Sequence, residues 1–151
     1  MSAIKYFNDD CLFRLPCKRI HNNWLRAAAQ AEGYATGDIN YIFCRSEKLL
    51  EINRQFLGHD YYTDVITFDE SDRRGRKIIS GEIYIDIDTV TDNAARYGIT
   101  VLHEVHRVMI HGLLHLCGYK DKTPSAAVRM RARENRYLRL LSKMHRTGPE
   151  Q

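Results

Sequence analysis

Long hydrophobic runs are missing from this sequence, and prolines are few. Three prolines and nine glycines in 151 residues exclude a collagen-like chain and a Pro/Gly-rich disordered one. No apolar run approaches the roughly 18 residues that a membrane-spanning helix needs. The first ten residues, MSAIKYFNDD, lack the apolar segment of a signal peptide. We therefore expect a cytoplasmic protein that does not enter the membrane.

Cysteine is also scarce, which bears on both disulfides and metal sites. Cys11, Cys17, Cys44 and Cys117 form no CxxC pair, and their spacing matches no zinc knuckle. In a reducing cytosol, such cysteines remain thiols. We expect four free cysteine side chains, most of them half-buried.

The composition is that of a globular domain, with 44% hydrophobic and 28% charged residues. No repeat or linker divides the chain, so we expect a single domain over residues 1–151. Helical spacing of apolar residues predicts helices over 17–32, 46–56, 89–97, 100–116 and from Thr123 to about Met144. Alternating or β-rich segments predict strands over 38–44, 63–68 and 78–88, separated by a charged loop at 69–77. Together they predict an α/β (α+β-like) fold, a small mixed sheet with packed helices.

Capping residues mark the ends of some of these helices. We expect Ser46 to be the N-cap of the second helix, and Gly58 to end that helix. Thr123 followed by Pro124 predicts the start of the last helix, with the threonine as N-cap.

The segment IHGLLHLCGYKD (110–121) carries the main chemical signal. The predicted helix over 100–116 is apolar around much of its circumference, which indicates a central position. His111 and His115 are four residues apart, so they lie on one face, close enough to share a metal ion. Gly118 lets the chain leave the helix, and a sharp turn would bring Asp121 to the same point. Two imidazoles and one carboxylate leave a fourth position open for water, as in catalytic zinc sites.

Other interpretations of the histidines stay open. A pair at this spacing is often only an exposed polar pair or part of a core. His103 and His106, in HEVH, are three apart with no third ligand after them, and we expect them to be surface or core residues. A zinc peptidase of the HExxH type has its general base directly after the first histidine, and that place is Gly112 here.

The last predicted helix has an acidic residue in its apolar stripe. Glu134 lies among apolar residues that recur at steps of three and four. These are Ala127, Met130, Tyr137, Leu138, Leu141 and Met144. A buried carboxylate needs a partner, and the free ring N–H of a metal-bound histidine is a suitable one. An ion pair with Arg131 or with a core arginine is the alternative.

The same helix is strongly basic on its other face. Between residues 120 and 146, nine cations stand against Asp121 and Glu134. The cations are Lys120, Lys122, Arg129, Arg131, Arg133, Arg136, Arg139, Lys143 and Arg146. Arginine-rich helices often simply present a solvated face. Next to a metal site, however, this charge favours a phosphodiester substrate over a peptide, with Arg129, Arg133 and Arg136 as candidate contacts to its phosphates.

These residues resemble a known family. HGLLHLCGYKD, followed by Met130 and Glu134 as MxxxE, is similar to the HGxLHLxGYDH motif of the YbeY family of bacterial endoribonucleases. Upstream, the segments IN (52–53), HD (59–60) and TDVITF (63–68) resemble its LNxxYRxxDxxTDVLSF segment, and GEIYI (81–85) resembles its GDIxI strand. The resemblance covers roughly residues 37–141.

The resemblance implies a single-domain α/β fold with one zinc ion per chain. It also implies a single-strand-specific endoribonuclease that acts on ribosomal RNA in its maturation and in ribosome quality control. The first two ligands then fall on His111 and His115, which are also the catalytic candidates. The third ligand, histidine in the common pattern, falls on Asp121, which makes the metal a weaker Lewis acid and tilts selectivity toward harder ions such as manganese.

A second departure concerns the family's arginine in YRxxD, which falls on Leu57. Unless Arg54 or another arginine replaces it, turnover is put in doubt. We expect the metal to polarise a phosphoryl oxygen or to lower the pKa of a bound water, with Asp64 and Glu82 as candidate bases. A zinc-dependent peptidase or amidase, or a non-catalytic RNA- or ribosome-binding protein, are the alternatives. The sequence does not indicate an oligomeric state.

Overall fold

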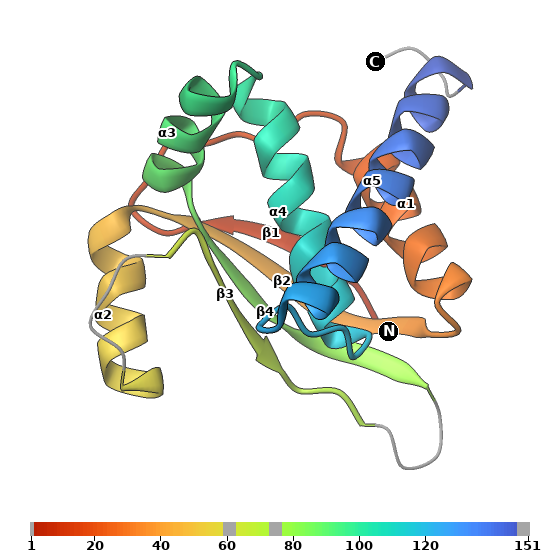
Figure 1. Ribbon diagram of the computed structural model, residues 1–151, viewed down its shortest axis with the longest axis horizontal. Coiled ribbons are helices and arrows are strands. Elements are labelled where there is room, and N and C mark those ends of the chain that lie inside the picture. Colours follow the sequence, from red (N-terminus) through yellow and green to blue (C-terminus); the bar gives the residue numbers. More distant parts are fainter. Residues whose placement is uncertain (1, 59–62, 73–76, 148–151) are drawn as a thin grey trace.

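The computed structural model describes residues 2–58, 63–72 and 77–147 (Figure 1). Helices and strands follow one another in an order close to the predicted one. The elements are β1 (Ile4–Asn8), α1 (Lys18–Ala31), β2 (Ala35–Cys44), α2 (Ser46–Leu57), β3 (Val65–Asp69), β4 (Ile78–Asp86), α3 (Ile87–Tyr97), α4 (Val101–Leu116) and α5 (Pro124–Thr147).

The strands form one four-stranded mixed sheet in the order β1-β2-β4-β3. β1 and β4 both pair with β2 in parallel, and β3 pairs with β4 antiparallel. Tyr41 of β2 lies opposite Tyr6 of β1 and Ile83 of β4, which fixes the register across the sheet. The sheet and its helices confirm the predicted α/β class.

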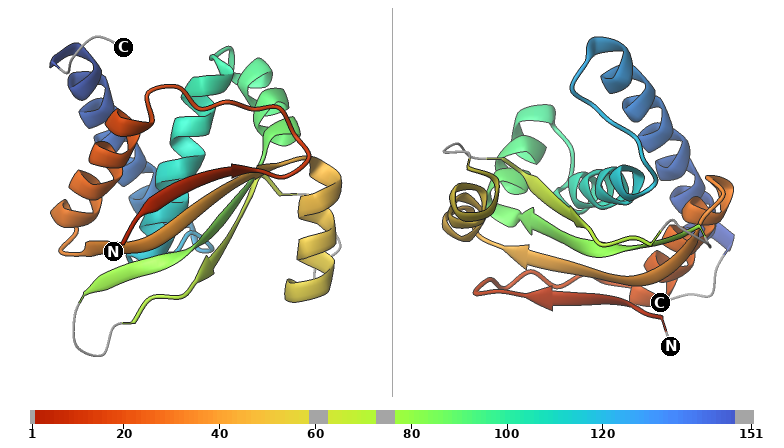
Figure 2. Two further views of the ribbon diagram at one scale, coloured as in Figure 1. Left: turned by 180° about the vertical axis from the view of Figure 1, so that it is seen from behind. Right: turned by 90° about the horizontal axis from the view of Figure 1, so that it is seen from below.

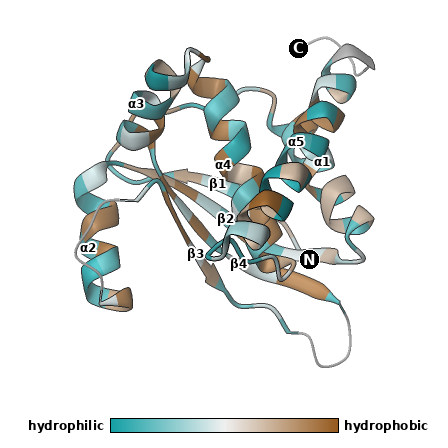
Figure 3. Ribbon diagram, viewed as in Figure 1, coloured by the Kyte–Doolittle hydropathy of each residue, from teal (hydrophilic) through white to brown (hydrophobic). Residues whose placement is uncertain are grey.

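The two faces of the sheet are covered unequally. Helix α4 crosses one face, with α1 and α5 beside it, and α2 stands apart from this group (Figures 1 and 2). Alternate strand residues explain the division: Ile83 and Ile85 belong to the main core, whereas Tyr84 packs against a smaller cluster with Leu49 of α2 and Ile66 of β3. Hydrophobic segments accordingly occur along both the strands and α4 (Figure 3).

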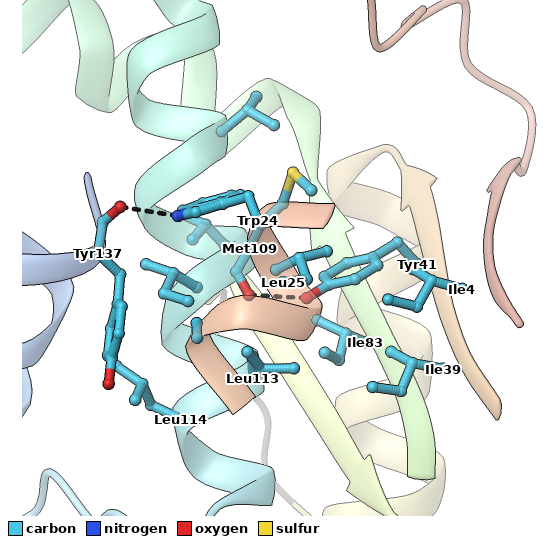
Figure 4. Packing of buried hydrophobic residues seen from close by; sticks show 14 of the residues in the cluster. Ile4, Trp24, Leu25, Ile39, Tyr41, Ile83, Met109, Leu113, Leu114 and Tyr137 are labelled. Carbon is cyan, nitrogen blue, oxygen red and sulfur yellow. Dashed lines mark hydrogen bonds between the residues drawn. The ribbon is translucent and has the colours of Figure 1, made fainter. Parts of the chain in front are cut away.

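Two buried hydrogen bonds anchor α4 and α5 in the main core (Figure 4). Trp24 Nε1 of α1 donates to the Tyr137 carbonyl of α5 at 2.7 Å. The Tyr41 hydroxyl of the sheet donates to the Met109 carbonyl of α4 at 3.0 Å. Because both groups are buried, losing either partner leaves an unsatisfied polar atom. The Tyr41 bond therefore holds α4, which carries the two histidines, over the sheet, and the Trp24 bond joins α5 to α1.

Most helix ends were predicted correctly, but two details were wrong. Arg45, and not Ser46, is the N-cap of α2, and the Ser46 hydroxyl donates to Asp86 Oδ2 at 2.6 Å instead. Asp86 also caps α3 by accepting from Thr89 N, so the serine serves a contact between elements. Ala127 is exposed rather than part of the apolar face of α5. Gly58 and Thr123 end and begin their helices as expected.

The remaining expectations concern cysteines, loops and the membrane. All four cysteines are thiols, as expected, but only Cys11 and Cys17 are half-buried, whereas Cys44 and Cys117 are buried in the core. Residues 59–60, and residues 73–76 of the charged loop predicted at 69–77, lie outside the described residues. Within the described ranges, none of the helices combines the length and hydrophobicity needed to cross a bilayer.

Candidate metal centre

The three predicted ligands come together at the C-terminal half of α4 and the loop after it. Helical spacing places the Nε2 atoms of His111 and His115 3.0 Å apart. Gly118 then adopts φ 100°, a conformation that favours glycine, and the chain turns back. The turn brings Asp121 Oδ2 to 3.2 Å from His111 Nε2 and 3.5 Å from His115 Nε2. These three residues could hold a metal ion.

The separations fit a small tetrahedral ion. Metal–ligand bonds of about 2.0–2.1 Å at tetrahedral angles place ligand atoms about 3.3 Å apart. The observed distances of 3.0, 3.2 and 3.5 Å lie on both sides of that value. In the part of the chain that the structure describes, no fourth His, Cys, Asp or Glu joins the group. An ion held by these three residues would therefore have a fourth position for water or substrate, as a catalytic site requires.

Hydrogen bonds on the far side of each ring fix which nitrogen faces the centre. His111 Nδ1 donates to Glu134 Oε2 at 2.6 Å, and His115 Nδ1 donates to the Tyr119 carbonyl at 2.9 Å. Both Nδ1 atoms are thus engaged, and both Nε2 atoms are directed to the same point as Asp121. Such outer hydrogen bonds orient metal-binding imidazoles and raise their basicity.

Glu134 is the acidic residue that the sequence placed in the apolar stripe of α5. It is 4% exposed, and its other oxygen accepts from Arg107 Nη1 at 3.0 Å. Arg131 lies farther away, at 3.9 Å. The sequence left open whether Glu134 pairs with a histidine or with an arginine, and in the structure it pairs with both. The carboxylate is therefore ionised, held in place and aligned with His111.

Glu134→Gln is expected to weaken zinc binding about 10- to 100-fold, the usual cost of losing a partner of a metal-binding histidine. The amide removes the negative charge that supports His111 and leaves Arg107 without its counter-ion. Competition with a chromophoric chelator measures the effect. Glu104→Gln is the matched control, because Glu104 is equally buried on α4 and contacts neither ligand histidine in the described hydrogen-bond network. Equal zinc affinity in both variants would contradict this role of Glu134.

The electrostatics of the centre follow from burial and from these contacts. Burial alone lowers the pKa of His111, but the hydrogen bond and the charge of Glu134 outweigh it and raise this pKa above its usual value. Burial raises the pKa of Glu134, yet the bonds from His111 and Arg107 hold it below its usual range. For His115, burial and the neighbouring His111 lower the pKa. The centre thus favours an ionised Glu134 beside a cation.

Three cavities meet at the ligands. The first, here called the α3 cavity, measures about 490 Å³ and reaches His111 and Asp121. The second, the basic cavity, measures about 860 Å³ and reaches His115 and Asp121. The third, the Leu57 cavity, measures about 450 Å³ and touches all three ligands. The candidate centre therefore lies where open spaces converge, and a bound substrate has room on more than one side.

Of the three predicted RNA-binding arginines, Arg129 lies beside the centre. It is exposed and lines the basic cavity together with Lys120 and Lys122. Arg133 lies 3.8 Å from Glu32 and above the Tyr119 ring, and Arg136 lies above the Tyr137 ring. Their contact with RNA stays a prediction.

The structure separates the two candidate bases. Asp64 lines both the α3 cavity and the Leu57 cavity, next to His111. Burial raises the pKa of Asp64, while the charge of His111 opposes this shift. Glu82 lies on β4 and accepts a long hydrogen bond from the Tyr84 hydroxyl at 3.5 Å. It is not among the described residues that line the three cavities.

Leu57 lies where the family pattern has an arginine. It lines the third cavity, beside Lys122, and is 43% exposed. Arg54, the suggested replacement, is exposed on α2 and is not among the described residues that line the three cavities. Lys122 is therefore the cation that accompanies Leu57 in this cavity.

Residue 112 explains why no base follows the first histidine. A Cβ atom on Gly112 would lie 2.8 Å from Ile83 Cγ2 of the sheet, too close for any side chain without movement. The position faces the sheet rather than the ligands, so a HExxH glutamate has no room there. His103 is exposed and His106 is buried, as expected, and His106 bonds to His21.

Sequence reasoning missed two residues behind the ligands. Arg107 holds Glu134, one turn before His111 on α4. Glu32, at the end of α1, accepts from the hydroxyls of Tyr119 and Tyr137, and the Tyr119 carbonyl holds His115. The i, i+4 spacing of Arg107 and His111 was a local signal for the first. The second joins segments far apart in the chain and had no local signal.

The fold and the candidate centre define a class of protein. It is a single mixed α/β domain with three residues that could hold a metal ion, two on a helix and one after the turn that follows it. Comparison with known proteins gives the family. The family described as Endoribonuclease YbeY matches residues 8–142. A curated Endoribonuclease YbeY of Parabacteroides distasonis is 48% identical over 92% of this chain and 96% of its own. The Endoribonuclease YbeY of Cytophaga hutchinsonii is 49% identical over 91% of this chain and 95% of its own. The chain belongs to the YbeY endoribonuclease family.

A solved structure agrees with this assignment. The solution structure of a protein from Thermotoga maritima superposes with a TM-score of 0.62 at 27% sequence identity. The match covers 97% of this chain and 94% of the other. The fold described above is therefore shared across nearly the whole length of both proteins.

Proposed function

We propose that this protein is a zinc-dependent, single-strand-specific endoribonuclease that hydrolyses RNA phosphodiester bonds. The observation that carries the proposal is the convergence of His111 Nε2, His115 Nε2 and Asp121 Oδ2 within 3.5 Å of one another beside a basic cavity. Membership of the YbeY family supports it. We also propose rRNA maturation and ribosome quality control as its role, with rRNA and the ribosome as partners in the cytoplasm.

In this proposal His111, His115 and Asp121 hold one zinc ion per chain. The bound ion would supply a Lewis acid for the phosphodiester. Because Asp121 adds a negative charge where the common pattern has a neutral histidine, the site also suits harder divalent ions such as manganese. Glu134 keeps His111 oriented, and the Tyr119 carbonyl does the same for His115.

Cations next to the centre would hold the RNA backbone. Lys120, Lys122 and Arg129 line the basic cavity, where Asp69 and Asp121 are the described acidic residues. Phosphates placed there gain charge-assisted contacts close to the ligands. Lys122 also lines the Leu57 cavity and supplies a positive charge where the family arginine is missing. Arg133 and Arg136 would extend this surface along α5.

Asp64 is the proposed general base. It lines two cavities beside His111, and burial raises its pKa toward the working range of a proton acceptor. From this position its carboxylate can take a proton from the attacking water. Glu82 has no comparable place beside the ligands.

The peptidase alternative lacks support at one specific position. Gly112 faces Ile83 of the sheet, so no base follows the first histidine on the ligand side. The non-catalytic alternative draws on Leu57 and Asp121, the two departures from the family pattern. Both alternatives predict a zinc-loaded protein that leaves RNA uncut.

The decisive experiment offers the zinc-loaded protein matched substrates. These are a labelled single-stranded RNA, the same RNA annealed to its complement, and casein. We expect cleavage of the single strand and little or none of the duplex or of casein. Cleavage of casein alone would establish the peptidase. Salt-dependent RNA binding that survives chelation, with no cleavage at any metal concentration, would establish the binding protein.

A further inference from the structure

An exposed aromatic ring stands in the α3 cavity. Tyr97 is the last residue of α3, is 60% exposed, and lines this cavity together with the ligands His111 and Asp121. In the part of the chain that the structure describes, its ring has no stacking partner and its hydroxyl no hydrogen bond. Burying such a ring against a planar group would gain free energy, so its exposure beside the centre calls for an explanation.

The other exposed aromatic side chains differ from Tyr97. Phe56 packs edge-to-face against Phe68 with ring centroids 6.0 Å apart. Phe7 lines a separate small cavity next to Phe13 and Phe43, away from the ligands. Among the described exposed phenylalanine and tyrosine side chains, only Tyr97 lines a cavity that also contains candidate metal ligands.

The charges of the α3 cavity determine what part of a substrate can enter it. Four carboxylates line it: Asp64, Glu104, Asp121 and Glu134. Its two guanidinium groups belong to Arg107, which is committed to Glu134, and to exposed Arg131. Even with the proposed divalent ion bound, these groups leave no net positive charge to hold a phosphate, whereas an uncharged ring needs none. The basic cavity, on the His115 side, has the opposite balance, with three cations against two carboxylates.

The polar groups near Tyr97 also suit a nucleobase. Asn93 lies one helical turn before Tyr97 on α3 and lines the same cavity. Its amide offers both a donor and acceptors, which match the edge of an unpaired base. Aromatic faces with a neighbouring amide are the usual means by which proteins hold bases of single strands. A duplex keeps its bases stacked and hidden from such a ring.

We propose that Tyr97 is the stacking platform for the base of a nucleotide next to the cleaved phosphodiester, with Asn93 facing the edge of that base. The backbone then passes the ligands and continues into the basic cavity. This inference rests on the proposed endoribonuclease function and deepens it. It gives a structural reason for single-strand specificity, because only an unpaired base can leave its stack to reach Tyr97.

The test combines protein variants with altered RNA. A single-stranded oligonucleotide with one main cleavage position is compared with versions that carry an abasic ribose on either side of that position. Tyr97→Ala should lower kcat/KM on the intact strand about 5-fold or more, mainly through KM, because a stacked base contributes at least that factor. Tyr97→Phe should retain activity. Phe7→Ala, which removes an exposed aromatic ring from a different cavity, is the control and should behave as wild type.

Stacking of a base on Tyr97 is identified when the losses caused by Tyr97→Ala and by removal of that base do not add. One of the two abasic substrates should lower wild-type kcat/KM by a similar factor, and Tyr97→Ala should then cause no further loss. Fluorescence anisotropy of the same oligonucleotides should show the same pattern in binding. The subsite would be overturned if Tyr97→Ala kept wild-type affinity or activity. It would also be overturned if Tyr97→Ala lost as much activity on both abasic strands as on the intact strand. Binding with this pattern but no cleavage by wild type would overturn the proposed function and leave the subsite standing.

Discussion

His111→Ala and His115→Ala should each lower RNA cleavage about 100- to 1,000-fold, because loss of the metal removes several kcal/mol of transition-state stabilisation and each 1.4 kcal/mol is a factor of ten. Each variant leaves at most two ligands, and the remaining imidazole still bonds on its Nδ1 side. Bound zinc should fall from one equivalent to a small fraction. Metal analysis after dialysis and single-turnover cleavage of a labelled single strand measure the two effects.

His145→Ala is the matched control for these two variants. His145 is an exposed histidine near the end of α5, and its ring approaches His21 rather than the ligands. Zinc content and cleavage should stay at the wild-type level in this variant. If His111→Ala cleaves RNA at the wild-type rate with no bound metal, the assignment of the centre is wrong.

Acid should unfold this protein partly through a second, buried histidine pair. His21 of α1 and His106 of α4 share a hydrogen bond between their Nε2 atoms at 2.8 Å. His21 Nδ1 bonds to the Cys17 carbonyl at 3.0 Å, so the shared proton belongs to His106 and both rings are neutral. His145 and His103 are the other titratable groups that act on His106, and both oppose a further positive charge.

The direction of the pH effect follows from the lowered pKa values. Burial and the neighbouring imidazole lower the pKa of His106 to about 3, and burial lowers that of His21. The unfolded chain binds protons near the ordinary value of about 6.5, whereas the folded chain does not. Stability is therefore fully present above about pH 6.5 and is lost as the pH falls. His106 alone should cost about 2 kcal/mol between pH 7 and pH 5, with His21 adding in the same direction.

Urea unfolding of wild type and His106→Asn at both pH values measures this contribution. The amide keeps a hydrogen-bond donor and cannot be protonated in this range. Wild type should lose about 2 kcal/mol more than the variant between pH 7 and pH 5. His103→Asn, which alters an exposed histidine on the same helix but leaves the His21–His106 bond in place, should lose nearly as much stability as wild type. If the free energy of unfolding changed equally with pH in wild type and His106→Asn, the histidine pair would make no pH-dependent contribution to stability.

The elements that the sequence predicted well have strong local signals. Helix α4 has a broad apolar surface and a capping Thr100, and its bounds differ from the prediction by one residue. The three candidate ligands were equally predictable from the sequence, because His111 and His115 share a helix face and Gly118 marks the turn before Asp121. Local periodicity and local conformational preference are enough for such features.

The parts that were missed depend on partners far along the chain. Strand β1 is short, and it is a strand because it pairs with β2 some 35 residues later, as in the Ile4–Ile39 pair. Ser46 has an ordinary capping sequence, but Asp86, 40 residues away, takes its hydroxyl. The bond between Tyr119 and Glu32 spans 87 residues. No window of local sequence contains both members of such pairs, so propensity alone cannot place them.

A crystal structure of the zinc-loaded protein, with anomalous data collected on both sides of the zinc absorption edge, tests the central claim most directly. The account predicts one strong anomalous peak about 2.0–2.2 Å from His111 Nε2, His115 Nε2 and Asp121 Oδ2, with a water or other non-protein ligand in the fourth position. A peak elsewhere, or a fourth protein atom that closes the coordination shell, would contradict a catalytic metal at this place.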